Sequence, residues 1–473
     1  MKTRDINITP SELELNIQKD FMEEVKAMDW SQGEKTYHLI TYGCQMNERD
    51  SEKIAGMLAE MGFKETAEQD QADMIIFNTC CVRENAENRL YGNLGHIKTL
   101  KEKNKDLKII LCGCMMQQNV VIDKITGSYN FVDIIFGTFN FYRLPQLLHT
   151  NLETGQQVID IWEQHGEIIE DLPSVRVNKF KAGVNIMYGC NNKCSFCIVP
   201  YVRGRERSRE VADIIKEIEE LVADGVKEIM LLGQNVNSYG KTLPIKVTFA
   251  QLLHEVNKVE GLERIRFMTS HPKDLSDELI DAIASCEKVC KQFHLPVQSG
   301  SNVILKKMYR SYTREKFLAV VEKLRAKVPD IILTTDIIVG FPTETDEDND
   351  QTVSLVEEVG FSNAYTYIYS KRENTPAAVM EDQIPEEVIK VRFNKVVNAM
   401  KPITLRINQE QIGKTEKVLV DQVNERDKTL MTGRLDNGLL VHFKGGDERL
   451  IGEIVPVKVV DCKTYYLIGE LAL

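Results

Sequence analysis

The chain has 473 residues, which at roughly 150 residues per domain suggests about three domains with several buried cores. Hydrophobic residues make up 43% and charged residues 27%, which excludes a disordered or fibrous chain. No apolar run approaches the roughly 18 residues of a membrane span, and no apolar stretch follows Lys2 and Arg4, so we expect a cytoplasmic protein without a membrane partner. The overall net charge of -12 argues against nucleic-acid binding, although a local basic patch could still bind phosphate.

The first 150 residues predict an open parallel α/β domain preceded by a charged extension. In the extension, residues 1–34, spaced apolar residues indicate one helix. A strand–helix alternation over residues 35–150 is typical of a parallel sheet flanked by helices. Its predicted elements are Tyr37–Thr41, Ser51–Met61, Asp73–Asn78, Glu84–Lys103 and Leu107–Leu111. The acidic, irregular residues 151–178 then indicate a linker.

A second alternation covers residues 179–404 and predicts a central partial barrel. Six strand–helix repeats are too few for a closed eight-stranded barrel, so we expect an open TIM-like (β/α)6 arrangement. The predicted strands are Gly183–Met187, Glu228–Leu232, Arg264–Met268, Gln292–Pro296, Ile331–Val339 and Ala364–Tyr369. Residues 405–473 change to five short β runs with a hairpin signal at Asp436-Asn437-Gly438, which predicts a small antiparallel β-barrel. The fold class is therefore α/β.

Three closely spaced cysteines, Cys190, Cys194 and Cys197, are the strongest chemical signal. Thiolates this close repel one another unless a cation neutralises them, and they are the usual ligands of iron–sulfur clusters and zinc. Structural zinc usually has four ligands in two pairs, whereas no fourth Cys or His lies near this trio. A 4Fe-4S cluster held by three cysteines leaves one iron open to a small molecule. Zinc and a buried cysteine turn are the alternatives.

A second set of cysteines, Cys44, Cys80 and Cys114, follows three predicted strands of the first domain. Because the carboxyl ends of parallel strands meet at one sheet edge, we expect these residues to gather there and hold a second cluster. Ordinary small residues at strand ends are the alternative. Cys81 and Cys112 are neighbours that could substitute for Cys80 or Cys114.

With these trios the chain resembles the methylthiotransferase family of the radical S-adenosylmethionine superfamily, from about residue 35 to its end. Its C-terminal barrel is similar to a TRAM domain, an RNA-binding module. Thr343 and Asn374 stand where the family usually has glycine. The matching stretches are Tyr42–Asn47, Asn78–Cys80, Gly113–Cys114, Gly189–Gly204, Thr269–Pro272, Leu295–Gly300 and Gly340–Pro342.

The resemblance is greatest to the branch that transfers a methylthio group to C2 of N6-isopentenyladenosine at position 37 of tRNA. It implies two 4Fe-4S clusters and two S-adenosylmethionine molecules per turnover. One would supply the 5′-deoxyadenosyl radical that removes the unactivated C2 hydrogen, and the other would supply the methyl group. Methylthiotransferases acting on threonylcarbamoyl-adenosine or a ribosomal protein would share both trios. An iron–sulfur carrier and a zinc-stabilised RNA-binding protein are alternatives of another class.

Further residues are candidates for contacts with the cofactor and RNA. The superfamily pattern implies Phe196 beside the cofactor adenine, and polar residues at strand ends suit its polar groups: Gln234, Asn235, Gln298 and Asp336. An extended segment would point four alternating arginines in one direction, toward RNA, unless they form a solvated face: Arg203, Arg205, Arg207 and Arg209. Barrel candidates for phosphate contacts are Lys417, Arg434, Lys444 and Arg449. We expect a monomer that binds tRNA and takes electrons from a flavodoxin or ferredoxin.

Overall fold

The computed structural model describes residues 9–28, 33–82 and 84–472, and it divides the chain into two compact units. Unit 1 comprises residues 1–177, 188–191 and 198–209, and unit 2 comprises residues 178–187, 192–197 and 210–473. The division cuts through the predicted central domain, because two short segments around the second cysteine trio cluster with the N-terminal unit. In the described part of the chain, no helix is both long and apolar enough to cross a membrane.

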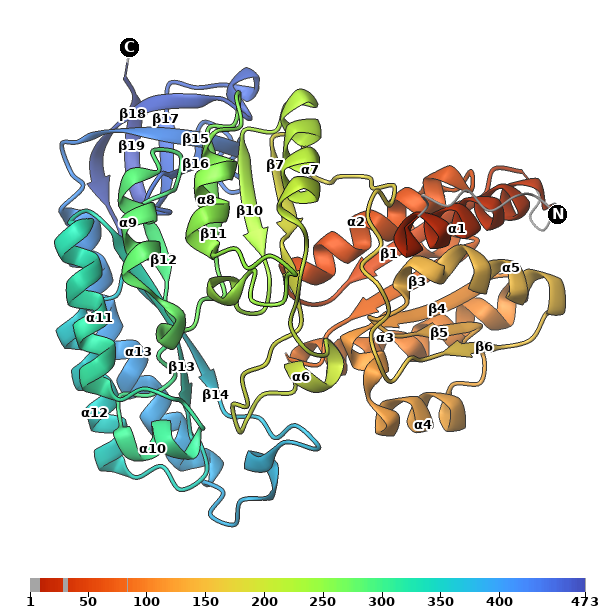
Figure 1. Ribbon diagram of the computed structural model, residues 1–473, viewed down its shortest axis with the longest axis horizontal. Coiled ribbons are helices and arrows are strands. Elements are labelled where there is room, and N and C mark those ends of the chain that lie inside the picture. The colour runs from red at the N-terminus through yellow and green to blue at the C-terminus, as the bar shows by residue number, and fades with distance from the viewer. Residues whose placement is uncertain (1–8, 29–32, 83, 473) are drawn as a thin grey trace. The chain divides into compact units, whose positions relative to one another are not determined.

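Unit 1 is built on a six-stranded parallel sheet (Figure 1). In spatial order its strands are β2 (Lys64–Glu65), β1 (Thr36–Thr41), β3 (Met74–Thr79), β4 (Lys108–Gly113), β5 (Ile134–Phe136) and β6 (Val158–Asp160). All six residues of β3 are buried, as expected for a strand covered on both faces. The three predicted strands β1, β3 and β4 are confirmed and are direct neighbours in the sheet.

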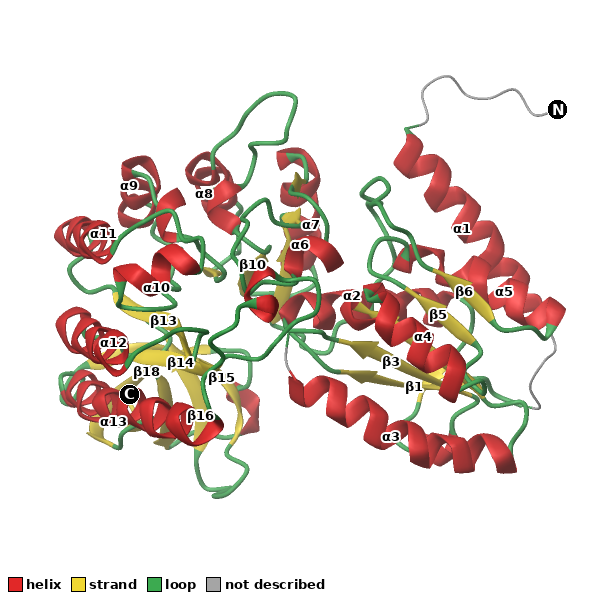
Figure 2. Cartoon of the chain, turned by 90° about the horizontal axis from the view of Figure 1, so that it is seen from below, coloured by secondary structure: helices red, strands yellow, loops and turns green. Residues whose placement is uncertain are grey.

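Helices cover both faces of this sheet (Figure 2). One face packs against α1 (Pro10–Ala27), α2 (Gln45–Glu60) and α5 (Leu144–Thr154). The other packs against α3 (Glu84–Lys103) and α4 (Asn119–Ser128). The helix expected in the N-terminal extension is therefore α1, which a capping box at Thr9 and Glu12 starts. Residues 1–8 and 29–32 of that extension lie outside the described residues.

Three short strands of the sheet, β2, β5 and β6, were not predicted, and β2 has only two residues. Strand β5 is only three residues long, so both β2 and β5 are too short to show a strand pattern. Strand β6 lies inside the stretch expected to be a linker, and it pairs with β5 through three parallel residue pairs. The linker prediction is therefore wrong for these three residues, because a free sheet edge can recruit a short segment whose own sequence shows no strand pattern.

The central part of unit 2 is the expected open arrangement of six parallel strands. They form two three-stranded sheets, β7 (Lys181–Asn185) with β10 (Glu228–Leu232) and β11 (Arg264–Phe267), and β12 (Gln292–His294) with β13 (Ile332–Val339) and β14 (Asn363–Ile368). Helices alternate with the strands and share one hydrophobic core with them. These helices are α7 (Val211–Ala223), α8 (Phe249–Asn257), α9 (Asp277–Ser285), α10 (Asn302–Lys307), α11 (Arg314–Lys327), α12 (Asp346–Val359) and α13 (Glu386–Gln409).

A small closed β-barrel completes unit 2. Its strands are β15 (Thr415–Val423), β16 (Met431–Leu435), β17 (Leu440–Lys444), β18 (Ile454–Cys462) and β19 (Leu467–Leu471). Four of the five pairings are antiparallel, whereas β17 and β19 run parallel. The closing of the barrel explains this exception. The last strand, β19, has to pair with the free edges of both β17 and β18, and it can be antiparallel to only one of them.

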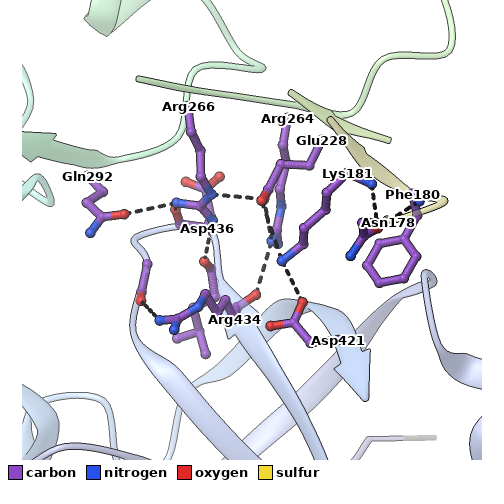
Figure 3. A network of polar contacts seen from close by, with 12 residues as sticks. Asn178, Phe180, Lys181, Glu228, Arg264, Arg266, Gln292, Asp421, Arg434 and Asp436 are labelled. Carbon is purple, nitrogen blue, oxygen red and sulfur yellow. Dashed lines mark hydrogen bonds and ion pairs between the residues drawn. The ribbon is translucent and has the colours of Figure 1, made fainter. Parts of the chain in front are cut away.

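Charged residues at the amino ends of the central strands fix this barrel in place (Figure 3). Arg264 donates hydrogen bonds to the carbonyl oxygens of Arg434 (3.0 Å) and Lys417 (2.7 Å). Arg266 donates to the carbonyl oxygens of Leu435 (2.9 Å) and Asp436 (3.0 Å). The barrel therefore docks at the strands' amino ends and leaves their carboxyl ends free for a ligand.

Candidate active site

The first cysteine trio lies where three neighbouring parallel strands end. Cys44 follows β1 and Cys80 follows β3, while Cys114 opens the 3₁₀ turn η2 (Cys114–Gln117) after β4. The register pairs Thr41 with Asn78 and Thr79 with Gly113, so the three strands end level with one another. The sheet thus brings residues about 35 positions apart in the sequence to one edge, as the strand-end argument expects.

Asn47 and two glycines hold this edge tightly packed. The Asn47 side-chain oxygen accepts hydrogen bonds from the thiols of Cys44 (3.4 Å) and Cys114 (3.9 Å). A Cβ atom at Gly43 would lie 3.0 Å from the Cβ atom of Cys80. Gly113 has a φ of +94°, and a Cβ atom there would lie 2.4 Å from the Asn78 side-chain oxygen. Only glycine therefore allows the backbone to approach so closely.

A buried arginine, Arg203, also reaches this edge. Its Nε donates to the Cys114 sulfur at 3.1 Å, and one terminal nitrogen donates to the Asn47 side-chain oxygen at 3.1 Å. Its other terminal nitrogen forms an ion pair with Asp50 at 2.8 Å, and both side chains are 6% exposed. A hydrogen bond from Cys81 and then the charge of Arg203 lower the pKa of Cys114, against the effect of burial. The donor set therefore favours a thiolate, the form that binds iron.

The predicted stripe of four arginines does not form. Arg203 is buried as described, and Arg209 makes two hydrogen bonds to the Glu170 carboxylate, at 2.8 and 2.6 Å. Arg207 donates to the Gly166 carbonyl oxygen at 2.8 Å. Only Arg205 is exposed. The same-direction expectation fails at Arg203, because the segment turns at Gly204, whose φ is +74°, whereas Arg207 and Arg209 both bind acceptors in the 166–170 segment and not RNA-facing solvent.

The second cysteine trio lies on a stretch that passes from one unit to the other. Cys190 belongs to unit 1, where its backbone N–H donates to the Gly204 carbonyl oxygen at 3.0 Å. Cys194 and Cys197 belong to unit 2, where the backbone N–H of Cys197 donates to the carbonyl oxygen of Cys194 at 3.1 Å. In the described residues, no three Cys, His, Asp or Glu side chains converge closely enough to hold a metal ion, so both ligand sets stay predictions.

Sequence reasoning missed a second arginine, the half-buried Arg310, which contacts Cys194. It donates to the Cys194 sulfur at 3.3 Å, to the Pro296 carbonyl oxygen at 2.9 Å and to the Tyr312 hydroxyl at 2.9 Å. Burial alone would lower the pKa of Arg310, but Tyr312 and Cys194 together raise it. No sequence signal pointed to this residue, because it lies 116 positions from Cys194.

Of the predicted cofactor residues, only Gln234 and Asn235 closely follow a strand of unit 2, whereas Asp336 lies inside β13, so the strand-end expectation is wrong for Asp336. Gln234 and Asn235 follow β10, and Asn235 donates to the Asp274 carboxylate at 2.8 Å. The Gln298 backbone N–H donates to the Asp336 carbonyl oxygen at 2.9 Å, so these two residues are direct neighbours. Phe196 is partly buried and packs against a separate apolar cluster formed by Ile304, Met308, Phe341 and Ala377.

Buried polar atoms at the same strand ends provide a test of whether a polar cofactor fits. Within the described residues, the side-chain oxygens of Asn235 and Ser270 and both amide atoms of Asn237 are buried without a hydrogen-bond partner. Such atoms cost free energy unless a partner satisfies them. The amino and carboxylate groups of S-adenosylmethionine have that chemistry, so this edge fits the cofactor.

The candidate RNA contacts in the barrel are all exposed. Arg449 forms an ion pair with Asp447 at 2.5 Å, and Arg434 donates to the Gly438 carbonyl oxygen at 3.2 Å. The carbonyl oxygens of Lys417 and Arg434 bind Arg264, which orients β15 and β16. Lys444 ends β17 and is exposed. The role of these residues in binding RNA stays a prediction.

Comparison with known proteins gives the fold and the family of the chain. Family models match residues 184–356 as "Radical SAM superfamily", residues 36–137 as "Uncharacterized protein family UPF0004" and residues 409–472 as "TRAM domain". A radical S-adenosylmethionine methyltransferase from Kitasatospora setae, solved with cobalamin and a 4Fe-4S cluster, has a similar fold, with a TM-score of 0.55. It is 14% identical, over 73% of this chain and 74% of that chain. Fold and family models together define a radical S-adenosylmethionine enzyme with a TRAM domain.

Curated relatives identify the family more closely. A tRNA-2-methylthio-N(6)-dimethylallyladenosine synthase from Lachnoclostridium phytofermentans is 56% identical over 436 residues, 92% of this chain and 95% of the relative. The enzyme of the same name from Acetivibrio thermocellus is 51% identical over 475 residues, 99% of each chain. This chain therefore belongs to the family of tRNA-2-methylthio-N(6)-dimethylallyladenosine synthases.

Proposed function

We propose that this protein transfers a methylthio group to C2 of N6-isopentenyladenosine at position 37 of tRNA. The observation that carries the proposal is the pairing of two cysteine trios, one at the end of three adjacent strands and one in the matched radical SAM segment. Relatives that share at least half of the sequence carry the name of this activity. A carrier protein or a zinc-stabilised RNA-binding protein would need neither the partial barrel nor two open clusters.

Each trio has its own task in this proposal. Cys190, Cys194 and Cys197 would hold one 4Fe-4S cluster, and Cys44, Cys80 and Cys114 would hold an auxiliary one. The bound groups supply the radical chemistry and the sulfur that no side chain can provide. The chain itself binds, orients and shields them. Arg310 donates a hydrogen bond to the Cys194 sulfur, and Asn235, Asn237 and Ser270 offer hydrogen bonds to the polar end of the cofactor.

The partners follow from the same chemistry. The barrel would bind tRNA through Lys417, Arg434, Lys444 and Arg449, with Arg205 as the remaining exposed arginine of the cluster segment. A flavodoxin or ferredoxin would supply single electrons. We further propose that the protein is cytoplasmic, because tRNA and a reducing environment that keeps thiolates available both belong to the cytoplasm. We also propose that it acts as a monomer.

The decisive experiment uses the full chain, reconstituted with iron and sulfide without oxygen. It is incubated with tRNA containing isopentenyladenosine, S-adenosylmethionine and a strong reductant. The RNA is then digested and its nucleosides are weighed. We expect isopentenyladenosine to gain a methylthio group in place of one hydrogen. Substituting any of Cys44, Cys80 and Cys114 by Ala should abolish this gain and leave about half of the iron.

Other results would redirect the assignment. If 5′-deoxyadenosine forms while the tRNA stays unchanged, the radical chemistry holds and the substrate is wrong. The threonylcarbamoyl-adenosine tRNA and the ribosomal-protein substrate are then tested in the same assay. If no 5′-deoxyadenosine forms although the protein contains iron, an iron–sulfur carrier replaces the enzyme.

A further inference from the structure

Arg203 is the buried cation of the first cysteine trio. Its guanidinium contacts Cys114, Asn47 and Asp50 within 3.1 Å and has almost no contact with solvent. Asn47 in turn accepts from Cys44, so one side chain links two of the three proposed cluster ligands. Helix α6 (Val199–Val202) ends immediately before it. Val202 packs against Cys81 and Cys114, and this contact fixes the position of the neighbouring Arg203 backbone.

A cation held this close to a ligand sulfur acts on any cluster bound there. Reduction of a cluster by one electron adds one negative charge. A fixed positive charge and an N–H donor on a ligand sulfur both stabilise the more negative state, and they therefore raise the reduction potential. Asp50 opposes this effect, but its contact is with the guanidinium, whereas the guanidinium itself donates to the sulfur.

We propose that Arg203 is a positioning residue of the auxiliary cluster that raises its reduction potential, and that Asp50 holds Arg203 in place and limits the increase. The inference rests on the proposed auxiliary cluster. It gives a role to a residue that the sequence placed among the RNA contacts. It also explains why an arginine from the segment that follows Cys197 is buried in the N-terminal unit.

The two charges predict shifts of opposite sign. Arg203→Met should lower the midpoint potential of the auxiliary cluster, because the donor and the positive charge are lost. Arg203→Lys keeps the charge without the planar donor geometry and should lower the potential less. Asp50→Asn removes the opposing negative charge and should raise it. Arg203→Met with Asp50→Asn should lie between the wild type and Arg203→Met.

The measurement is a dithionite titration of the full chain, followed by electron paramagnetic resonance. The background carries Cys190→Ala, Cys194→Ala and Cys197→Ala, so that only the auxiliary cluster contributes to the signal. Arg205→Met is the matched control, because Arg205 lies two residues away on the same segment and is exposed. It should leave the potential unchanged.

Three results overturn the inference. If the background protein binds no cluster, both the auxiliary cluster and the role of Arg203 are wrong. If a cluster forms but Arg203→Met shifts its potential no more than Arg205→Met, only the role of Arg203 is wrong. A shift of Arg203→Met and Asp50→Asn in the same direction would point to general distortion of the site and would also overturn it.

Discussion

At the scale of single residues, two arginines, the buried Arg203 and the half-buried Arg310, each donate to the sulfur of a proposed cluster ligand. Arg203 lies on Cys114 and Arg310 lies on Cys194. Each guanidinium has a further acceptor that offsets the cost of its lost hydration, Asp50 for Arg203 and the Pro296 carbonyl oxygen for Arg310. Both sites therefore carry a built-in positive charge that offsets part of the repulsion among thiolates.

Another buried charged group, Glu344, predicts a pH-dependent stability. Burial raises its pKa to about 7, although the Gly340 N–H and Arg392 both favour the charged form, while Asp348 disfavours it. A carboxyl group whose folded pKa is raised stabilises the fold fully below its ordinary pKa of 4.5. That stability is lost as the pH rises through 7. Glu344→Gln should therefore gain stability over the wild type by about 2 kcal/mol between pH 5 and pH 8.

Thermal or denaturant unfolding of the two proteins at a series of pH values measures this difference. Gln can still accept the hydrogen bond that the Gly340 N–H donates at 2.9 Å. Glu347→Gln, at an exposed position three residues further on in helix α12, gives the effect of the substitution without burial. A stability difference for Glu344→Gln that does not change with pH would contradict the prediction.

At the scale of elements, the two ends of strand β11 have different roles. Its amino end carries Arg264 and Arg266, which point to the same side because residues two apart in a strand share a face. Arg266 is held by Glu228 at 2.9 Å, so strands β10 and β11 present one buried charge network to the barrel (Figure 3). The carboxyl ends of the same strands lead to the proposed cofactor residues.

Breaking this network should destabilise the barrel's docking far more than breaking a surface pair. Arg266→Met leaves the carboxylate of Glu228 and two barrel carbonyl oxygens without their main donor, which costs about 3–5 kcal/mol. Lys227→Met is the matched control, because Lys227 lies next to Glu228 and pairs with Glu453, which is 56% exposed. That change should cost less than about 1 kcal/mol. Denaturant unfolding compares the two, and equal losses would contradict the prediction.

At the scale of the whole molecule, a net charge of -12 has to be reconciled with an RNA substrate. Bulk repulsion opposes the approach of phosphate, so binding must depend on a few exposed cations. Burial removes Arg203 and Arg209 from that group. The exposed barrel residues Lys417, Arg434 and Lys444 are the main remaining candidates.

The salt dependence of tRNA binding tests this distribution. Lys444→Met should weaken binding and lower the slope of log affinity against log salt by about 1, as expected for one lost phosphate contact. Lys323 lies on helix α11 and forms an exposed ion pair with Asp277 of helix α9, so Lys323→Met should leave the slope unchanged. Binding measured at several salt concentrations compares them. Equal slopes for both variants and the wild type would remove Lys444 from the interface.

Much of the architecture could be predicted because its signals are local. Helix α3 begins and ends as predicted, and so does strand β10. Helix α2 begins at Gln45 instead of Ser51, because the carbonyl oxygen of Cys44 already accepts the hydrogen bond of its first turn. Thr343 and Asn374, which replace the usual glycines, keep positive φ values of 72° and 65°. These two loops thus retain a glycine-like backbone without glycine.

The sequence by itself determined the two cysteine trios, the order of domains and the family, because these depend on spacing and on periodic patterns along the chain. Only the tertiary structure decided which cations serve which site. Arg203 binds a cysteine 89 positions away, and Arg264 binds carbonyl oxygens 153 and 170 positions away. The physical reason is that a charged side chain looks the same in the sequence whether it faces water or a buried partner. Its burial and its partner are fixed only when distant segments pack together.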